Sequence, residues 1–163
     1  MKRTNKKGSI QDIFFGASFI LLFAIAVIVG WMLFSKINTQ IQSTNDFSTE
    51  GKTLVNNFKN KYVAITDGMF ITIIVFLWLI ILILAYQIDV NPIFFPFAII
   101  VFGVLILITA VLGNTYNAFA TMTGITEYSA DYTIIPLVMN NFVQFILIIA
   151  FSIGIVMYGK TRG

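Results

Sequence analysis

Four long apolar runs without a charged side chain constrain this chain most: residues 13–34, 68–86, 92–113 and about 134–158. An α-helix rises about 1.5 Å per residue, so about 20 apolar residues cross a hydrocarbon core about 30 Å thick. Each run has 19 residues or more. The sequence therefore predicts an all-α fold, an integral membrane four-helix bundle that forms a single membrane domain over residues 1–163.

The composition excludes most soluble and catalytic classes. Of the residues, 58% are hydrophobic and 10% are charged, whereas soluble domains carry about 25% charged residues. Cysteine and histidine are both absent, which removes thiolate chemistry, disulfides, imidazole bases and the commonest metal ligands. No phosphate-binding glycine loop or nucleophile motif is present. We therefore expect no enzymatic activity, no cofactor and no metal.

Between the first two runs, residues 49–66 predict an additional extramembrane amphipathic helix. Its apolar residues recur mostly at three- and four-residue spacing: Leu54, Val55, Phe58, Tyr62 and Ile65. This helix would lie at the interface or against the first helix, which we expect to project one or two turns from the membrane. It would cap the bundle, or bind the membrane surface or a partner. The second transmembrane helix would then begin near Asp67-Gly68.

The later helices differ in regularity. The connector 87–91 is short and precedes Pro92, which favours a tight antiparallel hairpin of the second and third transmembrane helices. We expect the third helix to end at Gly113-Asn114. The fourth begins with a polar segment that contains Pro136, which predicts an interfacial or bent start.

Charge predicts the topology. Basic residues cluster at both ends of the chain, at Lys2, Arg3, Lys6, Lys7, Lys160 and Arg162. The 114–133 loop has no basic residue, and those of the 35–67 loop are spread out. Both termini are therefore expected on the cytoplasmic or virion-interior side, and the two larger loops opposite. The first run is longer than the apolar core of a cleaved signal, about 7–15 residues, so we expect a retained signal anchor.

The candidate site residues are uncharged. Asn140 and Gln144 are four apart on one helix face and, with Asn141, would pack against a neighbouring helix or provide selectivity. Trp78 lies in the middle of its run, so its indole N–H needs a partner on a neighbouring helix or subunit. Trp31 is expected as an interfacial anchor.

The acidic residues argue against transport. All seven are expected outside the hydrocarbon core, whereas ion-coupled transporters place ionisable groups inside it. They are Asp12, Asp46, Glu50, Asp67, Asp89, Glu127 and Asp131.

Several segments resemble a family. They are Asp89-Val90-Asn91-Pro92-Ile93-Phe94-Phe95, Gly113-Asn114-Thr115-Tyr116-Asn117, Pro136-Leu137-Val138-Met139-Asn140-Asn141 and Met157-Tyr158-Gly159-Lys160. Over roughly residues 69–160 the chain is similar to small four-span membrane proteins of tailless icosahedral viruses with an internal membrane. The resemblance implies a structural protein of the virion membrane, without catalytic residues.

Together these features predict a non-enzymatic structural membrane protein. Its partners would be the lipid bilayer and further copies of itself or other membrane or capsid proteins, with no specific nucleic acid. Two alternatives stay open: a holin-like pore-forming protein, and an accessory subunit of a host membrane complex.

Overall fold

The computed structural model describes residues 10–87 and 94–162, and every regular element in these ranges is an α-helix. The helices are α1 (Ile10–Ser43), α2 (Thr49–Gln87), α3 (Phe94–Ala120), α4 (Thr126–Ser129), α5 (Ile134–Asn140) and α6 (Phe142–Arg162). Three of them are long and apolar enough to cross a membrane, and a fourth span results if α5 and α6 count as one bent helix. This agrees with an all-α, multi-pass membrane protein.

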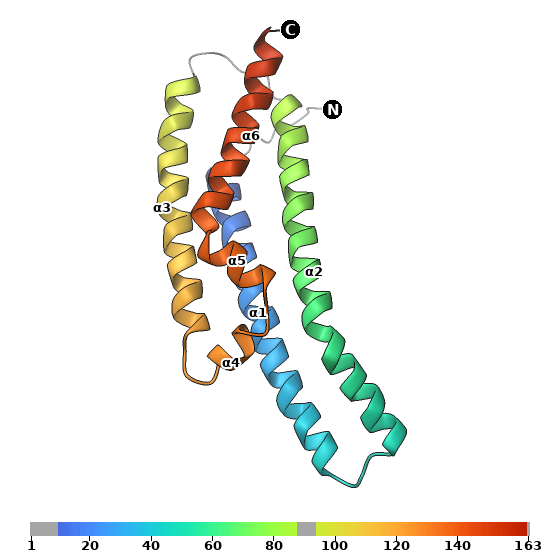
Figure 1. Ribbon diagram of the computed structural model, residues 1–163. Coiled ribbons are helices and arrows are strands. Elements are labelled where there is room, and N and C mark those ends of the chain that lie inside the picture. Colours follow the sequence, from blue (N-terminus) through green and yellow to red (C-terminus); the bar gives the residue numbers. More distant parts are fainter. Residues whose placement is uncertain (1–9, 88–93, 163) are drawn as a thin grey trace, which may run out of the picture.

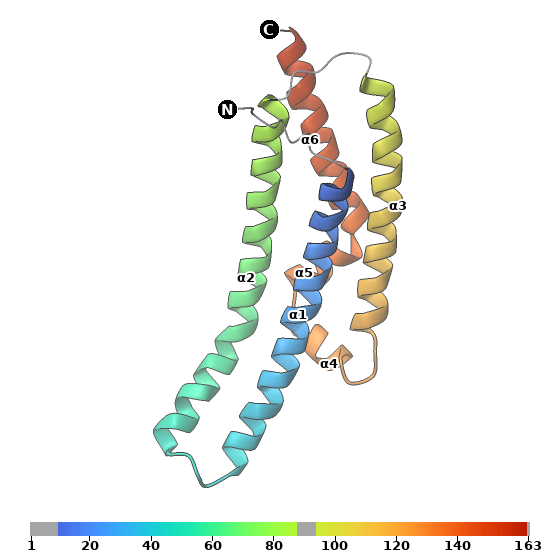
Figure 2. The same ribbon diagram turned by 180° about the vertical axis from the view of Figure 1, so that it is seen from behind.

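The long helices alternate around the bundle. Helix α1 packs on α2 and α3, and α6 packs on the same two helices. Consequently α2 and α3 stand on opposite sides of α1 and α6 (Figures 1 and 2). The expected tight pairing of the second and third spans is therefore wrong, because α1, α5 and α6 pack between them. The connector on which that expectation rested, with Pro92, lies outside the described residues.

A separate amphipathic helix is not present in the described structure. Residues 49–66 form the first part of α2, which runs through Asp67-Gly68 without a break. The hydroxyl of Ser48 accepts the Gly51 N–H at 3.1 Å and so caps the start of this long helix. Asp67 and Gly68 are therefore interior residues of α2, and the Asp67 side chain caps another segment, described below.

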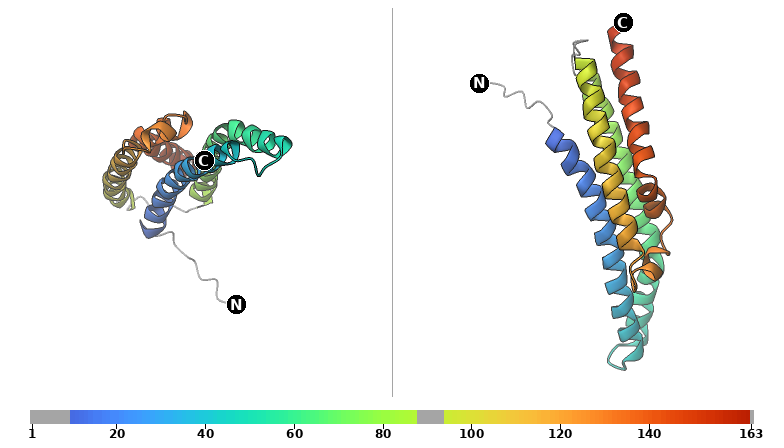
Figure 3. Two further views of the ribbon diagram at one scale, coloured as in Figure 1. Left: turned by 90° about the horizontal axis from the view of Figure 1, so that it is seen from below. Right: turned by 90° about the vertical axis from the view of Figure 1, so that its left-hand side faces the viewer.

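Helices α1 and α2 extend well beyond the other helices. With 34 and 39 residues, they are about 51 and 58 Å long, against a hydrocarbon core of about 30 Å. Their joined ends form the projecting hairpin, residues 36–61, which leans to one side of the bundle (Figures 1 and 3). Helix α1 thus continues past its apolar run to Ser43, in line with the predicted extension.

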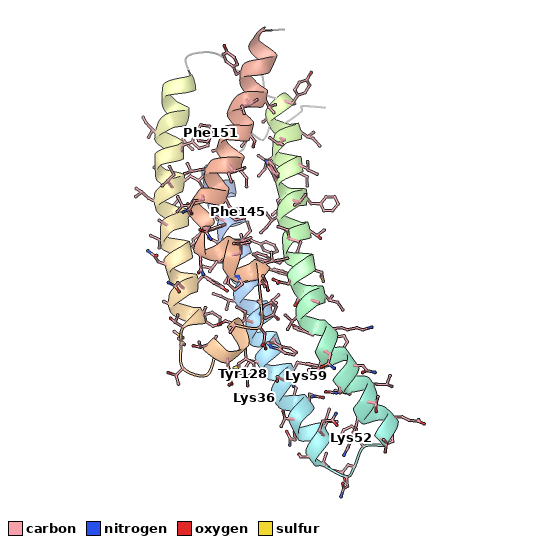
Figure 4. All side chains as sticks on the ribbon, viewed as in Figure 1. Lys36, Lys52, Lys59, Tyr128, Phe145 and Phe151 are labelled. Atoms are coloured by element: carbon pink, nitrogen blue, oxygen red, sulfur yellow. The ribbon has the colours of Figure 1, made fainter. Side chains whose placement is uncertain are left out.

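Two kinds of contact hold the projecting hairpin together. Lys52 Nζ donates to the Gln42 carbonyl at 3.1 Å, and Gln42 Nε2 donates to the Lys52 carbonyl at 2.9 Å. Nearer the bundle, the Phe34 ring packs on Phe58 and Tyr62, with centroids 5.2 and 5.9 Å apart. Lys36, Lys52 and Lys59 lie along this region (Figure 4).

The helix ends gather at two opposite ends of the molecule. The start of α1 and the end of α6 lie toward the same end of the molecule as the end of α2 and the start of α3, whereas the projecting hairpin and α4 lie toward the other end (Figures 1 and 3). Helix α3 continues past Gly113-Asn114 to Ala120, two turns further than expected. The bent start of the fourth span is confirmed, since α5 and α6 meet at 77°.

Candidate functional site

Asp67 is the buried acidic residue of the described structure, with 7% of its surface exposed. It sits on α2 and accepts three backbone N–H groups at the start of α5: Oδ2 from Thr133 at 3.0 Å and Ile134 at 2.8 Å, and Oδ1 from Ile135 at 2.9 Å. A helix N-terminus offers free N–H groups and positive dipole charge, which suit a carboxylate. The sequence predicts Asp67 outside the hydrocarbon core, near the start of the second span. The structure buries Asp67 among protein groups, where it caps α5, a helix that starts 67 residues later.

Aromatic residues form a layer beside this cap. The Trp31 indole N–H donates to Asp131 Oδ2 at 2.7 Å, and its ring stacks on Tyr62 at 5.5 Å. Trp31 is 5% exposed, so within the protein it is a buried link between α1 and the α4–α5 segment. The Tyr132 hydroxyl donates to the Val27 carbonyl at 3.5 Å. Burial raises the pKa of Tyr132, which keeps this donor protonated.

The α5–α6 break exposes backbone groups. Asn141 leaves helical geometry, and its side-chain amide donates to the Leu137 carbonyl at 2.8 Å. The Phe145 N–H bonds the Asn141 carbonyl at 3.0 Å, which makes Asn141 the N-cap of α6. The N–H groups of the first turn of α6 therefore have no helical acceptor.

A groove opens between this break and α3. Its volume is about 260 Å³. Four side-chain amides line it: Asn114 and Asn117 from α3, Asn140 from the end of α5, and Gln144 from α6. Thr109, Ala110, Gly113, Met139, Phe142 and Val143 complete the lining.

Gly113 allows α3 to approach the break closely. A Cβ atom at this position would lie 3.2 Å from the Met139 carbonyl oxygen and 3.7 Å from Phe142 Cβ. The shorter contact is tighter than nine in ten real Cβ contacts, so a larger residue would push the break away from α3. The floor of the groove thus depends on one glycine.

The structure brings together part of the predicted site. Asn140 and Gln144 line one groove from either side of the α5–α6 break, not from one helix face as predicted, and the side-chain amide of Asn141 donates to the Leu137 carbonyl instead. Trp78 does not line the groove, and its indole N–H is shielded without a hydrogen-bond partner among the described residues. The sequence reasoning missed Asn114 and Asn117 as site residues, although their three-residue spacing places them on one face of α3.

The basic residues that predict the topology have no described side-chain positions. The N-terminal set, Lys2, Arg3, Lys6 and Lys7, lies outside the described residues, as do the side chains of Lys160 and Arg162.

The groove can donate and accept hydrogen bonds but carries no charge. Each amide offers two N–H donors and an acceptor oxygen. Across residues 10–87 and 94–162, no group of three or more Asp and Glu side chains is close enough to hold a metal ion. Comparison with protein-family models, with curated proteins and with solved structures gives no match to this chain.

Proposed function

We propose that this chain is a non-enzymatic four-helix membrane protein that acts by packing, as a structural component of a membrane assembly. The observation that carries the proposal is Asp67. Its two oxygens bind three backbone N–H groups, so the buried carboxylate builds the fold and is not held free for proton or ion transfer. A pump keeps an ionisable group available inside the membrane, so a buried acid fully used as a helix cap favours a scaffold.

The projecting hairpin supplies a surface for a protein partner. Leu54 and Phe58 are 70% and 51% exposed there, although they lie 13 and 9 residues before Asp67 along α2. The charge-free run 68–86 begins just after Asp67, so we place the edge of the hydrocarbon core there. Measured from that edge, the two residues lie about 20 and 13 Å away along the helix, which exceeds the interfacial layer of about 5–8 Å on each side of a bilayer. Exposed apolar side chains beyond the lipid are typical of protein interfaces.

The resemblance of residues 69–160 to virion membrane proteins makes the internal membrane of a virion the proposed setting. Both termini would then face the virion interior or cytoplasm, and the projecting hairpin would face the opposite side. Further copies of this chain or capsid proteins would be its partners.

Leu54→Glu tests the packing role, with Asn57→Glu as the matched control. Both positions are exposed on the same turns of α2, but only the first replaces an apolar side chain. We expect Leu54→Glu to fold normally and to lose co-purification with the native assembly by at least tenfold, while Asn57→Glu is retained.

Two results would contradict the proposal. One is complete absence of the wild-type protein from every isolated membrane assembly, including purified virions. The other is release of potassium from vesicles that contain the purified chain, which would favour the pore-forming alternative.

A further inference from the structure

In the proposed membrane setting, the length of α6 would place the amide groove near the depth of lipid headgroups. The uncharged part of α6, from Phe142 to Tyr158, has 17 residues and is about 26 Å long, slightly less than the thickness of a hydrocarbon core. The break at Asn141 therefore falls at one edge of that core, on the side of the projecting hairpin. Asn114 also comes directly after the charge-free run of the third span.

The four side-chain amides of the groove are left without protein partners, whereas the Thr109 hydroxyl donates to the Leu105 carbonyl of its own helix. Among the described hydrogen bonds, none engages the side-chain amides of Asn114, Asn117, Asn140 or Gln144. At a membrane interface, irregular backbone and free amides require a polar occupant or water. The first turn of α6 adds free N–H groups and the positive end of the helix dipole, which favour an anionic oxygen.

We propose that this groove binds the phosphate and glycerol part of a phospholipid from the leaflet nearest the projecting hairpin. The amide N–H groups would donate to phosphate oxygens, and the amide oxygens would accept from glycerol or headgroup hydroxyls. The apolar members of the lining, Ala110, Phe142 and Val143, would contact the upper part of the acyl chains. This inference rests on the membrane location of the proposed function, but not on the structural role.

The absence of charge from the lining sharpens the prediction. Because neutral donors recognise the phosphate, phosphatidylcholine and phosphatidylglycerol should bind within a few-fold of each other. Binding should also change little between about 0.05 and 0.5 M salt, whereas lipid held by the basic termini would dissociate.

Native mass spectrometry of the detergent-purified full chain measures this directly, as the fraction of protein carrying one phospholipid. The test variant is Asn117→Ala/Gln144→Ala. The control is Asn57→Ala/Asn60→Ala, which removes two exposed amides from the projecting hairpin. All four positions are exposed or partly exposed on helices, so both variants should fold. We expect about tenfold weaker phospholipid binding in the test variant and none of this loss in the control.

Three probes define the ligand. Phosphatidylglycerol should bind, while diacylglycerol, which lacks the phosphate, and soluble glycerol phosphate, which lacks the chains, should bind at least tenfold more weakly. Equal binding of diacylglycerol would overturn phosphate recognition, and equal binding of glycerol phosphate would overturn a lipid as the source. Unchanged phospholipid occupancy in the test variant would overturn the site itself. These lipid-binding results are independent of the Leu54→Glu experiment, so failure of the lipid site and failure of the proposed packing role can be told apart.

Discussion

At the scale of single residues, this chain uses its few interior polar groups to join segments that are distant in sequence. Asp67 ties α2 to the start of α5, and Trp31 ties α1 to Asp131 over 100 residues. Hydrogen bonds shielded from water are worth more when one partner is charged. The α4–α5 segment is therefore held by these two contacts together with its buried apolar side chains Ile135, Val138 and Met139.

Replacing Asp67 tests this arrangement. Asp67→Ala leaves three N–H groups at the start of α5 without acceptors, so we expect the free energy of unfolding to fall by about 3 kcal/mol. Asp67→Asn retains one acceptor oxygen and should lose less. Reversible unfolding in mixed detergent micelles measures both values. A loss below about 0.5 kcal/mol for the alanine variant would show that the cap contributes little.

Two glycines of α3 provide a matched pair. Gly113→Leu should destabilise the protein by about 1–3 kcal/mol, because its Cβ would meet the Met139 carbonyl oxygen. Gly103→Leu has nothing within 4 Å of the new Cβ, and we expect it to be neutral or slightly stabilising. Unfolding of both variants under the same conditions checks the difference. Equal effects at the two positions would contradict the close approach of α3 to the α5–α6 break.

At the scale of elements, the sequence predicts spans better than it predicts their ends and neighbours. Charge-free runs mark the spans because a charge in hydrocarbon is strongly unfavourable. The Asp67-Gly68 pair looks locally like a helix start, but its partner at Ile135 is 68 residues away. No local pattern encodes that contact, so the boundary was wrong.

The residues of the groove also could not be predicted from local sequence patterns. Asn140 and Gln144 both line the groove, but they lie on two helices that meet at 77°, so their shared position does not come from the four-residue spacing on one helix. Asn114 and Asn117 were missed because Gly113-Asn114 resembles a helix end. In the structure α3 continues to Ala120. It packs closely on the α5–α6 break, and all four amides then line one groove.

Gly68→Ala tests the continuity of α2. If Gly68 is an interior helical residue with free space around it, alanine should raise the free energy of unfolding by about 1 kcal/mol. Gly124→Ala is the contrast, because Gly124 has φ of +83°, where a side chain is strained. Thermal unfolding compares them. A destabilising Gly68→Ala would instead indicate a helix boundary at Asp67-Gly68.

At the scale of the whole molecule, the helices divide into a bundle and the projecting hairpin. The apolar side chains that face outward on α3, such as Leu107 and Val111 at 69% and 63% exposure, suit contact with lipid. The projecting hairpin and α4 lie toward one end, and the start of α1 and the end of α6 toward the other (Figure 3). A bilayer around the bundle would separate these two ends.

Site-directed labelling in sealed membranes tests that separation most directly. The chain has no cysteine, so single-cysteine variants report one position each. Asn45→Cys lies in the turn of the projecting hairpin, Thr123→Cys between α3 and α4, and Gly159→Cys near the end of α6. With a membrane-impermeant maleimide, we predict that Asn45→Cys and Thr123→Cys react from one side and Gly159→Cys only from the other. Reaction of all three from the same side of intact vesicles would contradict a membrane-spanning bundle.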